Sequence, residues 1–534
     1  MGFSCPVSRR QSTRVEGQNE RQPTHPIPTR QNYPLVTRLR PLASPGNPAP
    51  NTRSNKPKAS SDCYARPNVT PVRRFSLMPL PFLSLLTLLV CVAADSATAA
   101  VVNSSDAWRP AEEILARIKA PVFPARDFQV TDFGAIGDGR TDSRAAFARA
   151  IAACTEAGGG RVVVPAGVFL SDGPVHLASN VNLHISEGAT LVFGADPARY
   201  LPAVLTRFEG TMLYGHSPRI YVRDATNVAI TGRGTIDGNG RATLDLMKDS
   251  PGRGGSGTLR RMGGEGVPVE HRIFGEGKWL RPSMVQFLEC TNVLVEGVTL
   301  KDSTFWVVHP VFCRNVTVRS ITVESMNGNN DGCDPDSSTD VLIEDCIFRT
   351  GDDAIAIKSG RDQDGRQIGR PSENIVIRRV TMGSRHSGLC IGSEMSGGVR
   401  NVYMEDCTVE TVSSALYFKS NLDRGGTVEH VRARRITVKS VRDGVIRFDT
   451  NYRAQDLRGG NTAPVFRDFL IEQVQCEEAR SFGIKIEGLP GTPIRDVMIR
   501  EVNIRKAATP VRIVETENVR LEAVMINGQS VPAP

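Results

Sequence analysis

Three aspartates, Asp331, Asp352 and Asp353, are the residues of this chain best placed to carry out acid–base chemistry. Each lies just ahead of a short segment of strand-like composition, C-D-P-D-S or I-A-I-K-S, rather than inside a helix or a charged surface run. When carboxyl groups lie close together their pKa values differ, because the charge of one carboxylate disfavours ionisation of its neighbour. Hydrolysis of a glycosidic bond needs one protonated and one ionised carboxyl group, and it needs no metal.

The spacing in the sequence predicts that these acids meet in space. Aligning Cys333 with Ile355 superimposes the two segments and puts Asp331 in the position of Asp353, 22 residues earlier. If 22 residues make one coil of a parallel solenoid, neighbouring strands lie about 4.8 Å apart. We therefore expect Asp331 and Asp353 to stack with Asp352 beside them, and at least one of the three pKa values to be raised.

An imidazole group is predicted to join the acids. Matching Leu389 to Ile355 puts His386 in the position of Asp352, with the extra residues of that coil in a polar loop over 360–372.

Lysines are predicted to line the other edge of the same surface. In this alignment Lys358, Gly392 and Lys419 share a position, so two cations flank a gap, and Tyr417 points outward beside Lys419. A groove with acids at one edge and lysines at the other suits an acidic polymer.

The elements that must hold these side chains are short repeated strands. Units rich in β-branched residues recur, and from Val293 onward they are spaced 22 to 38 residues apart. They begin at Val181, Val228, Val293, Val316, Val341, Ile375, Val402, Val431, Phe469, Val497 and Val519. A unit that cannot bury its apolar face alone, repeated at this period, predicts a stacked β-solenoid. We expect an all-β fold, a right-handed parallel β-helix.

Two further features concern the ends and the core of this solenoid. The segment Ala145–Cys154 reads as an amphipathic helix that caps its N-terminal end. Cys346 and Cys407 occupy positions held by valine or isoleucine in other coils, so we expect them to be buried and reduced. Cys290 and Cys313 share another position, where a disulfide bridge is sterically conceivable.

The N-terminal part differs from the rest in composition. Residues 1–74 carry 13 basic and 3 acidic residues, a net +10, whereas the whole chain is +8. The basic balance belongs to this leader, which we read as disordered or as translated sequence upstream of the true start, so it predicts no nucleic-acid partner.

An export signal follows the leader. Residues 75–99 combine an apolar run with A-T-A, typical of a signal peptide; a membrane anchor is the less favoured alternative. We therefore expect a single mature domain over 100–534, secreted or periplasmic, monomeric and without stable membrane association.

Four motifs, taken together, resemble those of the polygalacturonases, glycoside hydrolase family 28. They are N-N-D-G-C-D-P-D-S-S from Asn329, T-G-D-D-A-I-A-I-K-S-G from Thr350, R-H-S-G-L-C-I-G-S-E from Arg385 and L-Y-F-K-S-N-L-D-R-G-G from Leu416. The resemblance spans roughly Phe128 to the C-terminus. It implies a right-handed β-helix that hydrolyses α-1,4-galacturonosyl bonds of pectic substrates with inversion of configuration and without a cofactor or metal.

The resemblance also implies a role for each residue that matches a motif. Asp352 corresponds to the general acid, Asp331 and Asp353 to the carboxylates that activate water, and His386 to the imidazole that supports them. Lys419 corresponds to a residue that binds a substrate carboxylate.

One departure from the family pattern bears on substrate binding. The family's R-I-K is Y-F-K here, so Tyr417 stands where a forked arginine is expected. Tyr417 offers a ring face and one hydroxyl to a sugar, Lys358 and Lys419 remain to hold a uronate carboxylate, and Arg424 could supply the missing fork.

Two other classes of function are compatible with the sequence. The acid cluster could hold calcium in a pectic polysaccharide lyase, or the solenoid could bind glycans without catalysis.

Overall fold

A computed structural model describes residues 104–248 and 254–532. The predicted leader, residues 1–74, and the predicted signal peptide, residues 75–99, lie outside the described residues. None of the helices in the described part is both long enough and apolar enough to cross a membrane.

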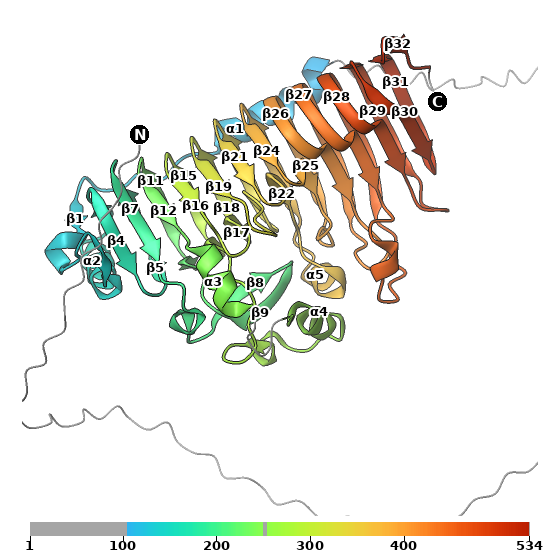
Figure 1. Cartoon of the computed structure of the whole chain (residues 1–534). Coiled ribbons are helices and arrows are strands. Elements are labelled where there is room, and N and C mark those ends of the chain that lie inside the picture. The colour runs from blue at the N-terminus through green and yellow to red at the C-terminus, as the bar shows by residue number, and fades with distance from the viewer. Residues whose placement is uncertain (1–103, 249–253, 533–534) are drawn as a thin grey trace, which may run out of the picture. The chain divides into compact units, whose positions relative to one another are not determined.

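The described chain winds into a stack of coils whose strands pair in parallel with those of the next coil (Figure 1). The strands form three columns, one for each side of the coil. Because parallel strands joined by crossovers are right-handed almost without exception, this is the predicted right-handed parallel β-helix. The predicted fold class is confirmed.

The first column contains the repeated units recognised in the sequence. It comprises β1 (Asp127–Gln129), β3 (Gly160–Val164), β6 (Val181–Ile185), β11 (Thr226–Gly232), β15 (Thr291–Glu296), β18 (Arg314–Arg319), β20 (Thr339–Glu344) and β23 (Ser372–Arg378). Val293, Val316, Val341 and Ile375 are register partners along it. The predicted repeat alignment therefore holds.

The second column lies at the next side of each coil. It comprises β2 (Asp138–Asp142), β4 (Gly167–Ser171), β7 (Ala189–Phe193), β12 (Thr235–Asp237), β16 (Thr299–Lys301), β19 (Thr322–Ser325), β21 (Ile347–Thr350) and β24 (Thr381–Ser384).

The third column carries the chemistry. It comprises β5 (Val175–Leu177), β10 (Ile220–Arg223), β14 (Val285–Leu288), β17 (Val308–Val311), a bridge at Cys333, β22 (Ile355–Ile357) and β25 (Ser387–Ile391).

The C-terminal coils continue the stack with longer, bent strands. These are β26 (Val399–Lys419), β27 (Thr427–Asp449), β28 (Val465–Glu487), β29 (Ile494–Ile504), β30 (Ala507–Val514), β31 (Thr516–Ile526) and the short antiparallel β32 (Gln529–Ser530).

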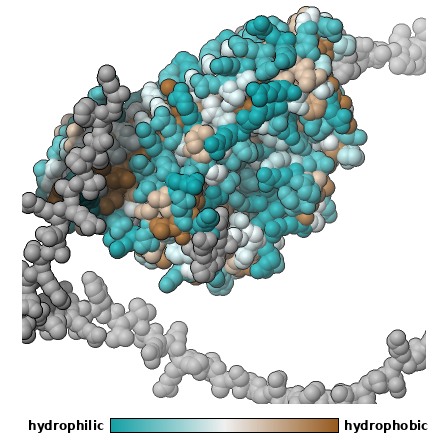
Figure 2. All heavy atoms as spheres, viewed as in Figure 1, coloured by the Kyte–Doolittle hydropathy of each residue, from teal (hydrophilic) through white to brown (hydrophobic). Residues whose placement is uncertain are grey.

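Apolar side chains fill the interior of the coils from end to end. The inward Ile355 and Ile357 are fully buried, as the alternation of the strand predicts. The eight cysteines that the structure describes are buried and unpaired, so Cys290 and Cys313 lie in adjacent coils as free thiols. Figure 2 shows that the face in view is largely hydrophilic, with apolar groups in small separate patches.

Two helices pack on this solenoid. α2 (Arg144–Glu156) covers its N-terminal end, confirming the predicted cap, and buries Phe147, Ile151 and Cys154. α1 (Ser104–Arg117) lies along the outside of later coils (Figure 1) and buries Trp108 and Ile114 against outward residues of the first column. No pattern in the sequence predicted α1.

Insertions between strands gather beside the third column (Figure 1). They are the antiparallel pair β8 (Val204–Phe208) and β9 (Thr211–Gly215), β13 (Ile273–Phe274), α3 (Gly240–Met247), α4 (Ser256–Gly264), α5 (Asp362–Ile368) and the short turn η4 (Ala454–Asp456). The β8–β9 turn, α4, the residue before α5 and η4 contribute side chains that line a cavity on this side of the solenoid.

Candidate active site

The register of the third column brings the predicted acids together. Cys333 bridges Ile355, and Ile355 pairs with Leu389, which pairs in turn with Leu416. Both alignments made from the sequence are therefore correct, and the acids occupy the turns where successive strands begin.

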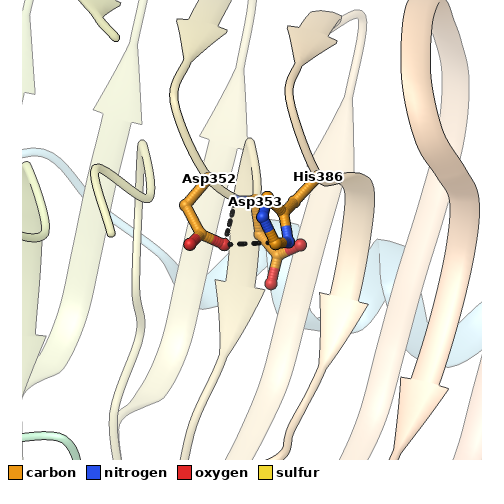
Figure 3. A group of neighbouring side chains, drawn as sticks. All are labelled: Asp352, Asp353 and His386. Atoms are coloured by element: carbon orange, nitrogen blue, oxygen red, sulfur yellow. Dashed lines mark hydrogen bonds and ion pairs between the residues drawn. The ribbon is translucent and has the colours of Figure 1, made fainter. Parts of the chain in front are cut away.

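Asp352, Asp353 and His386 form the centre of the site (Figure 3). Asp352 accepts a hydrogen bond from the backbone N–H of Asp353 through Oδ1, at 2.9 Å, and His386 Nδ1 lies 3.6 Å from that oxygen. The His386 side chain is 52% exposed, whereas that of Asp352 is 15% exposed. Asp352 therefore faces the open side of the site with an imidazole beside it.

The predicted lysines hold the two deeper acids. Lys419 Nζ donates to Asp353 Oδ2 at 3.2 Å, and the Ser387 backbone N–H donates to Asp353 Oδ1 at 2.9 Å. Lys358 Nζ lies 3.7 Å from Asp331 Oδ2. Asp353 and Asp331 thus each lie beside an ammonium group.

These contacts divide the acids by protonation. Burial, then the Asp353 carboxylate, raises the pKa of Asp352, and burial, then Asp352, raises the pKa of Asp331 well above its usual value. Burial alone would also raise the pKa of Asp353, but Lys419 and Lys358 outweigh it and lower this pKa to about 2. The site holds one firmly ionised carboxylate beside a carboxyl group that retains its proton more readily.

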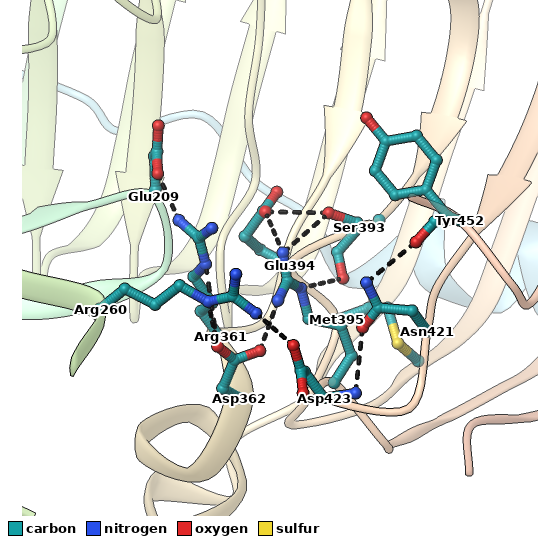
Figure 4. Close-up of polar contacts among 12 residues, drawn as sticks. Glu209, Arg260, Arg361, Asp362, Ser393, Glu394, Met395, Asn421, Asp423 and Tyr452 are labelled. Atoms are coloured by element: carbon teal, nitrogen blue, oxygen red, sulfur yellow. Dashed lines mark hydrogen bonds and ion pairs between the residues drawn. The ribbon is translucent and has the colours of Figure 1, made fainter. Parts of the chain in front are cut away.

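A cavity of about 160 Å³ opens above these acids. Its outer wall is a network of ion pairs between insertions (Figure 4). Arg260 of α4 reaches Asp362 and Asp423, at 2.6 Å each, and Arg361 pairs with Glu209 of the β8–β9 turn. The network joins segments far apart in the sequence and closes one side of the cavity.

Two residues considered for substrate binding, Tyr417 and Arg424, are engaged by other protein groups. Tyr417 is not among the residues that line the cavity: it is buried, and its hydroxyl donates to Asp449 Oδ2 at 3.2 Å. Arg424 does line the cavity, but its guanidinium is already bonded to Asp362, Ser393 and Glu394. Neither residue supplies a free fork.

Lys358 borders the cavity but is also engaged by the protein. Its Nζ donates to Gly392 O at 2.9 Å and lies 3.4 Å from Glu394 Oε2. Its clearest function is to balance the buried charge of Glu394 and to oppose the rise in the pKa of Asp331.

Sequence reasoning missed the residues of the wall, namely Glu209, Arg260, Arg361 and Glu394. A signal for part of the wall was present, because 65 residues separate the repeat units at Val228 and Val293. A gap of that length predicts an insertion, although it does not predict where the insertion folds.

The acid cluster does not suit calcium. Asp352, Asp353 and His386 can bring one ligand atom each to within 4.8 Å of one another. Calcium prefers six to eight oxygen ligands, whereas this set includes an imidazole, and an ammonium group already occupies Asp353. The donor set fits acid–base chemistry better than a calcium-dependent lyase.

A carboxyl group with a raised pKa beside an ionised carboxylate, on the surface of a parallel β-helix, suits the hydrolysis of a glycosidic bond. The family model of the glycosyl hydrolases family 28 matches residues 154–524, so the chain belongs to that family. The resemblance noted in the sequence is confirmed.

Known proteins similar to this chain carry related names. A probable polygalacturonase of Vitis vinifera is 31% identical over 403 residues, covering 72% of this chain and 75% of the relative. The crystal structure of a hyperthermoactive exopolygalacturonase from Thermotoga maritima is 42% identical with a TM-score of 0.75, covering 79% of this chain and 96% of that one. A polygalacturonase from Erwinia carotovora, 24% identical with a TM-score of 0.57, shares the fold and covers 76% and 98% of the two chains.

Proposed function

We propose that this protein is a polygalacturonase that removes galacturonosyl units from the ends of pectic chains. The observation that carries the proposal is the difference in pKa between two adjacent aspartates. The pKa of Asp353 is lowered, so it is ionised, and the pKa of Asp352 is raised, so it holds a proton more readily. The similarity to an exopolygalacturonase of known structure supports action at a chain end. So does the small walled cavity, well below the ~300 Å³ at which pockets for larger ligands begin.

In the proposed mechanism each acid has a separate task. Asp352 gives its proton to the glycosidic oxygen, which then leaves with the departing sugar. Asp353, aided by Asp331, takes a proton from a water molecule that attacks the anomeric carbon from the opposite face, so the configuration inverts. His386 lies against Asp352 and supports its protonation cycle.

The remaining residues position and balance these groups. Lys419 keeps Asp353 ionised, and Lys358 balances Asp331. Tyr417 lies behind Lys419, whose Nζ is 5.0 Å from the centre of its ring, and so supports Lys419 rather than the sugar. We infer that the enzyme is exported and acts on plant cell-wall material without a stable protein partner.

Product analysis on oligogalacturonates of defined length tests the proposal. We expect saturated products, released stepwise from one end, with rates unchanged by a chelator. An unsaturated product with new ultraviolet absorbance, together with loss of activity on chelation, would identify a lyase instead. Products of many lengths at early times would refute action at chain ends.

A further inference from the structure

Most of the cationic side chains that line the cavity are already paired with acidic groups of the protein. Six lysine and arginine residues line it: Lys358, Lys419, Arg260, Arg361, Arg424 and Arg453. If the proposed function is correct, on which this inference rests, a carboxylate of the bound galacturonosyl chain must find a cation among them.

Both lysines are committed to protein acids. Lys419 holds Asp353, and Lys358 lies between Asp331 and Glu394. Moving either lysine toward a substrate would leave a buried carboxylate without its partner, which is costly.

Two of the arginines, Arg260 and Arg361, are committed to the wall of the cavity (Figure 4). Arg260 spans Asp362 and Asp423, and Arg361 pairs with Glu209.

Arg424 is saturated as well. One terminal nitrogen binds Asp362, the other lies 3.1 Å from Glu394 Oε1, and Nε donates to the Ser393 carbonyl at 3.1 Å. The Arg424 guanidinium, suggested from the sequence as a bidentate ligand of the substrate, therefore binds protein groups of the cavity wall instead.

Arg453 differs from the other five cations. Within residues 104–248 and 254–532, no acidic side chain forms an ion pair with its guanidinium, which is exposed at the cavity. Asp456 lines the same cavity without pairing with it. The Arg453 guanidinium packs against the ring of Tyr452, whose centre lies 5.2 Å from its Cζ.

Arg453 also lies close to the reacting groups. The Tyr452 ring that it contacts is approached by Lys419 Nζ at 5.3 Å, and Lys419 holds Asp353. One aromatic ring therefore separates the unpaired guanidinium from the lysine at the centre of the site.

The tyrosine at position 417 explains why such a residue is needed. The Tyr417 ring is packed between Lys419 and Arg447, whose Cζ is 4.3 Å from its centre. The position where the family motif has an arginine therefore presents no fork to the cavity. The loop that follows β27 brings Arg453 to the cavity one coil further along the solenoid.

We propose that Arg453 binds the carboxylate of a galacturonosyl unit in the cavity and takes over the task of the arginine that is absent at position 417. A guanidinium can hold a carboxylate through two parallel hydrogen bonds, and Tyr452 orients it from one side. This contact selects acidic sugars over neutral or esterified ones.

The test compares Arg453→Ala with Arg453→Lys and the parent on trigalacturonate and on its methyl ester. Loss of a charge-assisted bidentate contact should raise KM for trigalacturonate about 10- to 100-fold with little change in kcat, because the contact is made in both ground and transition states. The lysine variant keeps the charge but not the fork, so it should recover part of this loss. KM for the methyl ester should hardly change.

Arg505→Ala provides a matched control, because Arg505 is exposed and does not line the cavity. Calorimetric titration with trigalacturonate, in an Asp352→Asn background that slows turnover, should show the same loss of affinity for Arg453→Ala. Unchanged KM and affinity for Arg453→Ala, in an enzyme that hydrolyses trigalacturonate, would overturn the assignment of Arg453. A parent enzyme that neither binds nor hydrolyses trigalacturonate would instead overturn the proposed function.

Discussion

Replacing Lys419 by methionine should alter both the stability of the protein and its response to acid. The change removes the ammonium group 3.2 Å from Asp353 Oδ2 and leaves that buried carboxylate with the hydrogen bonding of Ser387 and the charge of Lys358. A folded-state pKa of about 2, against 3.8 for an ordinary aspartate, corresponds to roughly 2.5 kcal/mol. Breaking a buried ion pair typically costs about 3 to 5 kcal/mol. We expect the free energy of unfolding at pH 7 to fall by about 2 to 5 kcal/mol.

The sign of the pH dependence follows from the lowered pKa of Asp353. This group stabilises the fold above the unfolded-state pKa of 3.8, and the contribution is lost as the pH falls toward 2. The difference between parent and Lys419→Met should therefore be largest near neutral pH and shrink below about pH 4.

Catalysis should become sensitive to acid in the same variant. Because burial without Lys419 raises the pKa of Asp353, the acid limb of kcat should move upward by about 2 pH units or more. Urea unfolding at pH 7 and pH 4, with kcat profiles at saturating substrate, measures both effects.

Two variants separate the ion pair from a general loss of lysine. Lys506→Met removes a 74% exposed lysine paired with Glu478, and should cost at most about 1 kcal/mol. The double variant Asp353→Asn/Lys419→Met should recover part of the lost stability but no activity, since it removes the unpaired charge. If Lys419→Met matched the parent in unfolding free energy at pH 7 and in its acid limb, Lys419 would not control Asp353.

Three further predictions address the acid, the tyrosine and the N-terminus. Asp352→Asn should lower kcat about 10²- to 10⁴-fold with unfolding unchanged, and near-parental turnover would remove Asp352 from the mechanism. Tyr417→Phe should leave KM on oligogalacturonates within experimental error, because Tyr417 does not line the cavity; a large rise in KM would show that its hydroxyl reaches the substrate. N-terminal sequencing of exported protein should begin near Ala100, and a mature chain that starts before Arg73 would contradict the predicted signal peptide.

The coils and their register could be predicted from the sequence because strand periodicity is local. Each unit shows β-branched alternation by itself, and matching Cys333, Ile355 and Leu389 was enough to place Asp331, Asp353 and His386. In a solenoid, the contacts between neighbouring coils follow from that alignment alone.

The insertions could not be predicted in the same way, because they repeat nothing. The ion pair of Arg260 with Asp362 joins residues 102 positions apart, and its partner Asp423 is 163 positions away. No period or motif relates such residues. The exposure of Arg453 and the burial of Tyr417 likewise depend on loops whose paths the sequence does not reveal.

The protonation states of the active-site aspartates depend on which residues occupy one column of the solenoid surface. Lys358, Gly392 and Lys419 occupy successive positions of that column, and the glycine has φ of +101°, which favours a residue without a side chain. A Cβ at Gly392 would lie 2.0 Å from the carbonyl oxygen of Lys419, so any other residue would displace that strand end. With the middle position empty, Lys358 reaches Asp331 and Lys419 reaches Asp353 from opposite sides. Asp353 forms an ion pair with Lys419, whereas within the described residues Asp352 forms none with a lysine. This difference between two adjacent aspartates separates the ionised base from the acid.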